Sequence, residues 1–162
     1  MNAPAQAQAS SGGLALDAYL PFRLSVASNA VSRLIARAYE DRFGLTIPQW
    51  RLICVLAQEG ALSPGALVSR TGMDKVTVSR AAQGLARRRL VARTDHHADG
   101  RSHVLALSAE GSALYAEVEP LALAYEAALI AGLAPDEVSL LKRLLVRLQG
   151  AAGALAGEAP AN

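Results

Sequence analysis

The sequence predicts a mainly α-helical protein with a small β wing. Three observations lead to this prediction. Hydrophobic residues make up 52% of the 162 residues but aromatic residues only 4%, and the Ala and Leu that dominate the apolar content favour helices. Apolar residues recur at helical spacing in long segments near both ends. Between these segments, residues 63–107 contain two short helix patterns joined by a turn and followed by a hairpin pattern, which is the order of a winged helix-turn-helix domain.

The N-terminal part predicts a tail followed by a long helix. Residues 1–16 are rich in Ala, Gln and Ser, and we expect them to be disordered. The helix is expected over residues 17–43, with Pro21 tolerated only near its start and Gly44 in the terminating position. Its apolar residues at helical spacing are Leu24, Ala27, Val31, Leu34, Ile35 and Ala38.

Three shorter helices are expected next, each with its own start signal. Thr46 opens one that ends at Gly60, Ser63 caps the second, and Asp74 caps the third. The expected buried stripe of the third is Val78, Ala82 and Leu85. Gly84 inside that helix costs about 1 kcal/mol relative to Ala, which close packing of another helix would explain.

The C-terminal half predicts a hairpin and two helices. Residues 90–93 and 103–107 read as strands, joined by a loop with turn-forming Asp and Gly residues. Ser108 caps a helix in which Pro120 predicts a kink or a break. Pro135 starts a last helix, and we expect residues 151–162 to be a flexible tail. The apolar stripe of the last helix is Val138, Leu141, Leu144, Leu145 and Leu148.

The terminal helices are too long and too apolar to serve only a small winged domain. A large exposed apolar surface usually marks an interface. We therefore expect a homodimer in which one domain, residues 17–150, combines a winged helix (about 46–107) with dimerisation helices (about 17–43 and 108–150). The alternative is that these helices pack only within one chain.

Positive charge is concentrated in the predicted helix-turn-helix and hairpin. Between residues 70 and 103, eight Lys and Arg residues accompany three Asp residues, whereas the whole chain carries a net charge of only +2. A basic patch confined to one motif is typical of phosphate binding. The alternative, a solvated charged face, would be favoured without the helix-turn-helix pattern.

The helix after Asp74 has the side chains that read duplex DNA. Arg80 can bond a guanine edge, Gln83 suits adenine, and the methyl groups of Val76 and Thr77 suit thymine. Arg101, at the predicted wing tip, suits a narrow minor groove. The complete set of candidate DNA contacts is Ser63, Lys75, Val76, Thr77, Ser79, Arg80, Gln83, Arg87 and Arg101. For Arg87 and its neighbours Arg88 and Arg89, stabilisation of the helix end is the alternative.

Other classes of protein are disfavoured. The sequence shows no nucleophile–base pair, phosphate-binding glycine loop or convincing metal set, so we expect no enzyme, no cofactor and no metal. A zinc site at His96, His97, Asp99 and His103 is the weaker alternative to histidines that face phosphates. Cys54 lies among apolar residues, which predicts a buried, unreactive thiol. Without a signal pattern or a membrane-spanning run, a cytoplasmic location is expected.

These segments together resemble the MarR family of winged-helix transcriptional regulators. The resemblance covers roughly residues 25–148 and is carried by LTIPQWRLICVLA, DKVTVSRAAQGLARRRLVAR, DGR, HVLAL and SAEG. It implies a homodimer that binds palindromic operators in double-stranded DNA, most often as a repressor, and is released by a small aromatic acid or phenol or by oxidation. Two departures are Arg89, where a Gly is common, and Gly100, where a basic residue is frequent.

The resemblance also implies an effector site between the winged domain and the dimer helices. Mapped onto this chain, the crevice would be lined by Ser25, Ser28, Asn29, Arg33, Trp50 and Arg51. Trp50 would offer a stacking face, and Arg33 or Arg51 would pair a carboxylate. The alternative is that Trp50 belongs to the core and both arginines to the surface. For the whole protein, the alternative function is a winged-helix module that binds protein and not an operator.

Overall fold

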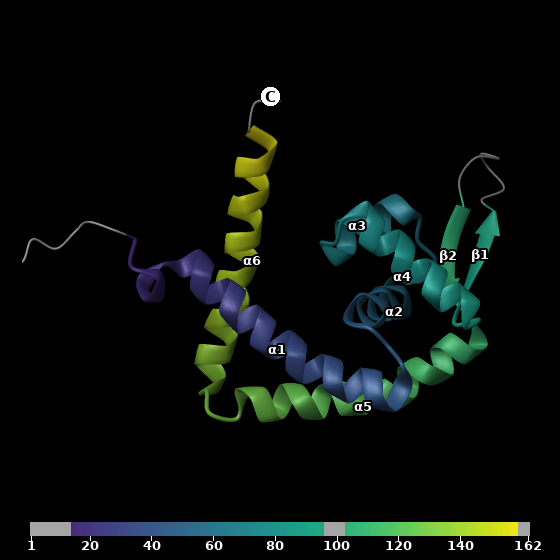
Figure 1. Cartoon of the computed structure of the whole chain (residues 1–162), viewed down its shortest axis with the longest axis horizontal. Coiled ribbons are helices and arrows are strands. Elements are labelled where there is room, and N and C mark those ends of the chain that lie inside the picture. Colours follow the sequence, from purple (N-terminus) through teal and green to yellow (C-terminus); the bar gives the residue numbers. More distant parts are fainter. Residues whose placement is uncertain (1–13, 96–102, 159–162) are drawn as a thin grey trace, which may run out of the picture.

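The computed structural model describes residues 14–95 and 103–158. The elements follow one another as η1 (Leu16–Ala18), α1 (Leu20–Phe43), α2 (Ile47–Glu59), α3 (Pro64–Thr71), α4 (Lys75–Arg87), β1 (Val91–Asp95), β2 (His103–Leu107), α5 (Ala109–Ile130) and α6 (Pro135–Glu158). Figure 1 shows α2, α3, α4 and the two strands gathered at one end, with α1 beside α5 and α6 standing at the other end. The predicted class, mainly helical with a small wing, is confirmed.

Helix α1 begins later than the sequence suggested. Asp17 lies in the short 3₁₀ turn η1, Tyr19 is extended, and α1 starts at Leu20 so that Pro21 falls in its first turn. The first-turn N–H groups have no partner within a helix, and this is why proline is accepted there. The end is as predicted, because Gly44 adopts a left-handed conformation with φ 60°.

The start signals of the three short helices are confirmed. Thr46 forms a capping box, in which its hydroxyl accepts a hydrogen bond from the Gln49 amide and the Gln49 side chain accepts one from the Thr46 amide. Ser63 accepts a hydrogen bond from the Ala66 amide at 3.2 Å. Asp74 caps α4 through the Thr77 amide. Each cap satisfies amides that the helix itself leaves without partners.

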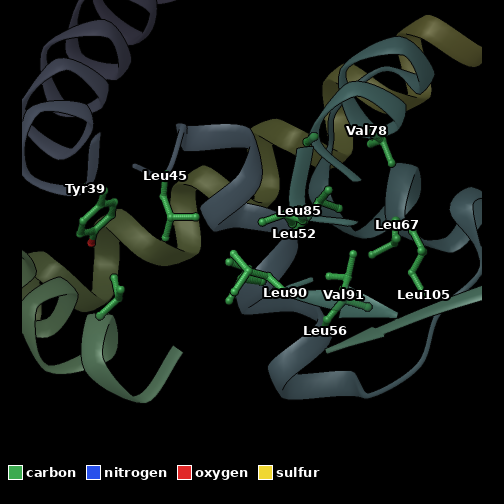
Figure 2. Close-up of a cluster of buried hydrophobic side chains, with 13 residues drawn as sticks. Tyr39, Leu45, Leu52, Leu56, Leu67, Val78, Leu85, Leu90, Val91 and Leu105 are labelled. Carbon is green, nitrogen blue, oxygen red and sulfur yellow. The ribbon is translucent and has the colours of Figure 1, made fainter. Parts of the chain in front are cut away.

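One apolar core holds the winged unit, α2 to β2, together (Figure 2). The fully buried side chains at its centre come from different elements and include Tyr39, Leu45, Leu52, Ile53, Leu67, Leu85 and Val118. Tyr39 comes from α1 and Val118 from α5, so both long helices close this core. Burying a Leu or Val side chain stabilises the fold by about 1.5–3 kcal/mol.

The wing is a two-stranded antiparallel sheet. The strands pair from Val91 opposite Leu107 to Asp95 opposite His103, so β1 begins one residue later and ends two residues later than expected. Leu62, ahead of α3, joins the sheet through mutual backbone hydrogen bonds with Leu105 of 2.8 and 2.9 Å. The base of the wing is thereby fixed to the start of the helix-turn-helix.

Helix α5 runs without a break through Pro120, so the predicted split is wrong, while the kink stays a prediction. The proline removes one helix hydrogen bond, to the carbonyl of Ala116, and both residues are exposed. Water can therefore satisfy that carbonyl, which makes proline tolerable at this position. The predicted cap is confirmed, since Ser108 accepts a hydrogen bond from the Gly111 amide at 2.9 Å.

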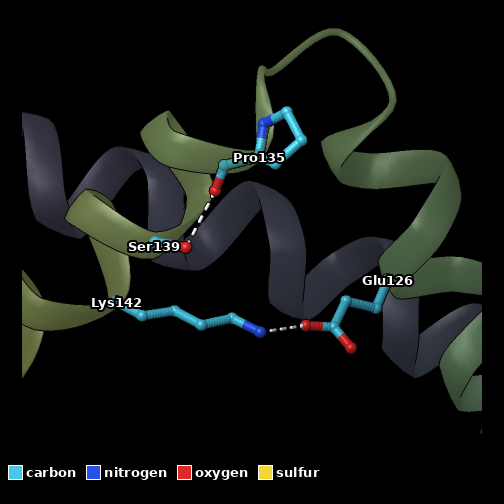
Figure 3. Close-up of polar contacts among 4 residues, drawn as sticks. All are labelled: Glu126, Pro135, Ser139 and Lys142. Atoms are coloured by element: carbon cyan, nitrogen blue, oxygen red, sulfur yellow. Dashed lines mark hydrogen bonds and ion pairs between the residues drawn. The ribbon is translucent and has the colours of Figure 1, made fainter.

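Helix α6 follows α5 after a bend of 107°. Across this corner the Lys142 ammonium donates to the Glu126 carboxylate at 2.9 Å, and within the first turn of α6 the Ser139 hydroxyl donates to the Pro135 carbonyl at 2.8 Å (Figure 3). The expected end near Gly150 is wrong, because α6 continues to Glu158. Residues 151–157 contain four Ala and one Leu, and their helix propensity offsets that of the two glycines.

Within the described residues, no single helix has the length and hydropathy of a membrane span; only α5 and α6 taken together across their bend reach it.

Candidate nucleic-acid interface

The turn between α3 and α4 is held by its own side chains. The buried Thr71 donates its hydroxyl to the Leu67 carbonyl at 2.6 Å, and Gly72 turns the chain with φ 65°. Asp74 then accepts two hydrogen bonds from Thr77, from the amide at 2.8 Å and from the hydroxyl at 2.7 Å. These bonds lower the pKa of Asp74. The start of α4 is thus fixed relative to α3.

One side of α4 is buried against the rest of the winged unit. Val78 and Leu85 are buried as expected, while Ala81 is more deeply buried than Ala82. Gly84 faces the side chain of Gln49 on α2, and a Cβ at this position would collide with the Gln49 amide. The close helix packing inferred from Gly84 is therefore present.

The opposite side of α4 is open to solvent. Val76 is 58% exposed. The other exposed candidates on α4 are Lys75, Ser79, Arg80, Gln83 and Arg87. The Gln83 amide nitrogen donates to the Ser79 hydroxyl at 3.3 Å, which orients the Gln83 amide. This face has the exposure that base and phosphate contacts require, and the contacts themselves stay a prediction.

Two candidates outside this open face have internal partners. Thr77 is half-buried and its hydroxyl proton is used by Asp74, which leaves its methyl group as the available surface. Ser63 is half-buried and its oxygen accepts the Ala66 amide, so its hydroxyl hydrogen remains available to a phosphate.

A groove of about 610 Å³ separates α4 from the wing. Val68, Val78 and Leu105 are among the apolar residues that line it, and Lys75 and Arg93 bring positive charge to it. Arg93 lies with its guanidinium 3.0 Å from the Nδ1 atom of His103. Lys75 and Arg93 are side chains of the kind that contacts phosphate in nucleic-acid complexes, whereas most of the groove surface is apolar.

Arg93 was not among the predicted contacts, and His103 was predicted only as one of the histidines that face phosphates. Strand alternation was the signal that could have found them. Arg93 pairs with Leu105 in the sheet, and His103 is two residues from Leu105, so all three share one face of the hairpin. That face lines the groove beside α4.

Part of the basic cluster has partners within the protein. The Arg88 guanidinium donates to the backbone carbonyls of Phe43 and Gly44, both at 2.8 Å. Arg70 forms an ion pair with Glu59. Arg89 has a φ of 59°, a left-handed conformation that glycine adopts most easily. Of these residues only Arg70 is paired with a negative charge, while Arg88 keeps its charge but is directed toward the protein backbone.

Some predicted residues lie outside the described part of the chain. These are Arg101, His96, His97 and Asp99.

The predicted effector residues are spread along α1 and the first part of α2. Ser25, Ser28, Asn29 and Arg33 are exposed on α1, and Arg51 is exposed on α2. A small cavity of about 160 Å³ lies between α1 and α5, next to Ile35 and Tyr125. None of the six predicted effector residues lines this cavity or the groove beside α4. Their role as a binding site stays a prediction.

Trp50 packs in an aromatic cluster. Its ring lies 5.3 Å from Tyr39 and is stacked on Tyr115 at 5.7 Å, so it contributes to the core. The Tyr115 hydroxyl donates to the Glu119 carboxylate at 2.6 Å, which raises the pKa of Tyr115 to about 12. A ligand that stacks on Trp50 would have to displace a tyrosine.

Cys54 lies near this cluster on α2 and is half-buried. Burial, and then the negative charge of Glu119, raise the pKa of its thiol to about 12. Because the thiolate is the reactive form, the raised pKa agrees with the unreactive thiol that the apolar neighbours predict, although Cys54 is half-buried and not fully buried.

Known proteins share both the sequence pattern and the fold. A sequence model described as the MarR family matches residues 43–102. An uncharacterized HTH-type transcriptional regulator of Mycobacterium bovis is 33% identical over 98 residues, which is 60% of this chain and 68% of that relative. A similar relative from Mycobacterium leprae is 32% identical over the same shares.

Two solved structures extend the match over most of the chain. The Bordetella bronchiseptica protein BpsR, whose DNA binding is regulated by 6-hydroxynicotinic acid, is 27% identical with a TM-score of 0.79 and covers 85% of this chain and 98% of BpsR. A MarR family transcriptional regulator of Silicibacter pomeroyi is 27% identical with a TM-score of 0.74 and covers 85% and 91%. With its helix-turn-helix, its wing and these relatives, this chain belongs to the MarR family of transcriptional regulators.

Proposed function

We propose that this protein is a homodimeric repressor that binds a palindromic operator and is released by a small aromatic carboxylate or phenol. The observation that carries the proposal is the open face of α4, where Arg80 and Gln83 are exposed and Gln83 lines the groove that Lys75 and Arg93 edge. Arg80 would read guanine and Gln83 adenine in the major groove. The wing would lie along the adjacent backbone, with Arg101 at its tip in the minor groove.

The apolar surface of α6 supports the homodimer. Leu141 and Leu145 are 46% and 43% exposed, and Leu144 and Leu148 are exposed as well. Soluble monomers rarely expose so many neighbouring leucines. We assign α1, α5 and α6 to dimerisation, so that two copies of α4 meet half-sites one helical turn apart.

The test of operator binding is fluorescence anisotropy with DNA from the promoter that adjoins the protein's own gene. We expect tight binding that weakens steeply with salt, because phosphate contacts release counterions. Arg80→Ala should weaken specific binding by about 1–3 kcal/mol. Arg143→Ala, which removes the same charge from the exposed side of α6, is the matched control and should bind as the parent does.

The outcomes separate this proposal from its alternative. Absence of binding at low salt would contradict a role at this promoter. A protein partner bound with an affinity that salt leaves unchanged would favour the winged-helix interaction module instead. We propose no catalytic activity, because the relatives are transcriptional regulators, and we place the protein with its DNA target in the cytoplasm.

The effector class rests on one relative. DNA binding by BpsR is regulated by a hydroxylated pyridine carboxylate, and Arg33 and Arg51 offer this chain two exposed guanidinium groups for a carboxylate. A ligand that binds only the folded protein must raise the melting temperature. Hydroxybenzoates and pyridine carboxylates should do so, and Arg33→Ala or Arg51→Ala should abolish the rise. An unchanged rise in both variants would contradict the proposed site.

A further inference from the structure

Arg88 links the end of the reading helix α4 to the end of α1. As the C-cap residue of α4, it extends its guanidinium to the carbonyls of Phe43 and Gly44, 45 and 44 residues earlier in the chain. We call these two hydrogen bonds, each 2.8 Å long, the Arg88 bridge.

The guanidinium of Arg88 is chemically matched to the two helix-end carbonyls that it binds. The last carbonyls of a helix have no partner within it and form the negative end of the helix dipole. A guanidinium offers two N–H donors in a planar fork and keeps its charge at all working pH values. A Cβ at Gly44 would lie 3.8 Å from the nearer guanidinium nitrogen, so the side chain fits closely over the turn.

The residues that follow Arg88 attach the same corner to α5. The Arg89 carbonyl accepts the Ser108 hydroxyl at 2.6 Å, and the Leu90 carbonyl accepts the Ser108 amide at 3.1 Å. The Leu90 carbonyl also abuts Gly111, where a Cβ would not fit. The left-handed Arg89 is unfavourable for a residue with a side chain, so these contacts hold a strained corner in place.

We propose that Arg88 is a positioning residue for operator recognition, whose bridge to Phe43 and Gly44 sets the placement of α4 against α1. The inference rests on the proposed function, in which α1 belongs to the dimer interface. If α1 is fixed to its partner, the Arg88 bridge helps to set the distance between the two copies of α4. Arg88 therefore serves specific binding without touching DNA.

The neighbouring Arg87 provides the matched comparison. It sits one residue away, carries the same charge and is exposed as Arg88 is, but it belongs to the predicted DNA contacts and not to the Arg88 bridge. Arg88→Gln and Arg87→Gln are compared by anisotropy on operator and on unrelated DNA over a range of salt concentrations. The temperature is one at which circular dichroism shows every protein fully folded.

The two variants should lose DNA affinity in different ways. Arg88→Gln should weaken operator binding roughly tenfold, leave the salt slope unchanged and barely alter binding to unrelated DNA, because a misplaced α4 loses base contacts first. Arg87→Gln should weaken binding to both DNAs and reduce the salt slope by about one. Arg88→Lys keeps the charge but not the fork, and should also weaken operator binding.

Other results overturn the inference. A reduced salt slope in Arg88→Gln would make Arg88 a phosphate contact. Operator affinity at the parent level with only a lower melting temperature would make the bridge purely structural. If Arg88→Gln does not fold, Arg88→Lys is measured instead, and operator affinity at the parent level in that variant would likewise show that the bridge is purely structural. If the parent protein does not bind the operator, the proposed function and this inference both fail. If the parent binds and the Arg88 substitutions leave its operator affinity unchanged, only this inference fails.

Discussion

The winged unit and the terminal helix α6 differ in how far their apolar side chains are buried. In the winged unit, residues such as Leu52, Ile53 and Leu67 are fully buried by neighbours from the same chain. On α6, only Val138 among residues 135–157 is even half-buried, and the other side chains are exposed. The first region is complete in one chain, and the second is not, which indicates that a further surface is needed to cover α6.

The largest expected effect is on the free energy of unfolding and comes from a substitution in the winged unit. Leu67→Ala should lower the free energy of unfolding by about 2–5 kcal/mol, because a cavity replaces a side chain with no exposed surface. Leu155→Ala on α6, where the side chain is 70% exposed, should change it by less than about 0.5 kcal/mol. Urea denaturation at low protein concentration measures both, and equal losses would contradict the distinction between the regions.

The next largest effect is expected on dimerisation, from substitutions of the exposed leucines of α6. Leu141→Glu combined with Leu145→Glu should raise the dimer dissociation constant by at least about 100-fold, since the variant would bury unpaired carboxylates in the proposed interface. Sedimentation equilibrium measures this constant, and circular dichroism at low concentration should show an intact winged unit. The matched control is Arg143→Glu combined with Arg147→Glu, which places two carboxylates at other exposed positions of the same helix. A double leucine variant that remains dimeric would move the interface away from α6.

The contrast also explains what the sequence could predict. Cap residues such as Thr46, Ser63 and Asp74 act on amides two or three residues away, so their roles follow from local spacing. The exposed face of α4 followed in the same way from helical periodicity. These local rules led to the correct order of elements and to the candidate DNA-reading face.

Contacts between distant segments did not follow from local rules. Nothing near Arg88 in the sequence indicates that its partners are the carbonyls of Phe43 and Gly44. The stacking of Trp50 on Tyr115 likewise joins α2 to α5. The extension of α6 to Glu158 was missed because glycines at 150, 153 and 157 resemble a linker, although alanines separate them.

Two glycines test the difference between the winged unit and α6 with a single type of substitution. Gly111→Ala should destabilise the fold by about 1–3 kcal/mol, because the added Cβ meets the backbone carbonyl of Leu90, which cannot move aside cheaply. Gly153→Ala on α6 has open space around it and should stabilise by about 0.5–1 kcal/mol through helix propensity. Thermal unfolding followed by circular dichroism gives both signs, and a stabilising Gly111→Ala would contradict the close contact.

The smallest effect concerns the charge of the α4 cap. Hydrogen bonds from Thr77 lower the pKa of Asp74 below its ordinary value of 3.8. A carboxyl whose pKa is lowered by folding adds stability at neutral pH, and this stability is lost as the pH falls through 3.8 and then through the lower folded value. Asp74→Asn keeps a good cap residue but not the charge. The parent should therefore melt slightly above Asp74→Asn at pH 7, and the difference should shrink progressively below about pH 4. A difference that stays constant down to pH 2 would show that the ionised carboxylate adds nothing to the start of the reading helix.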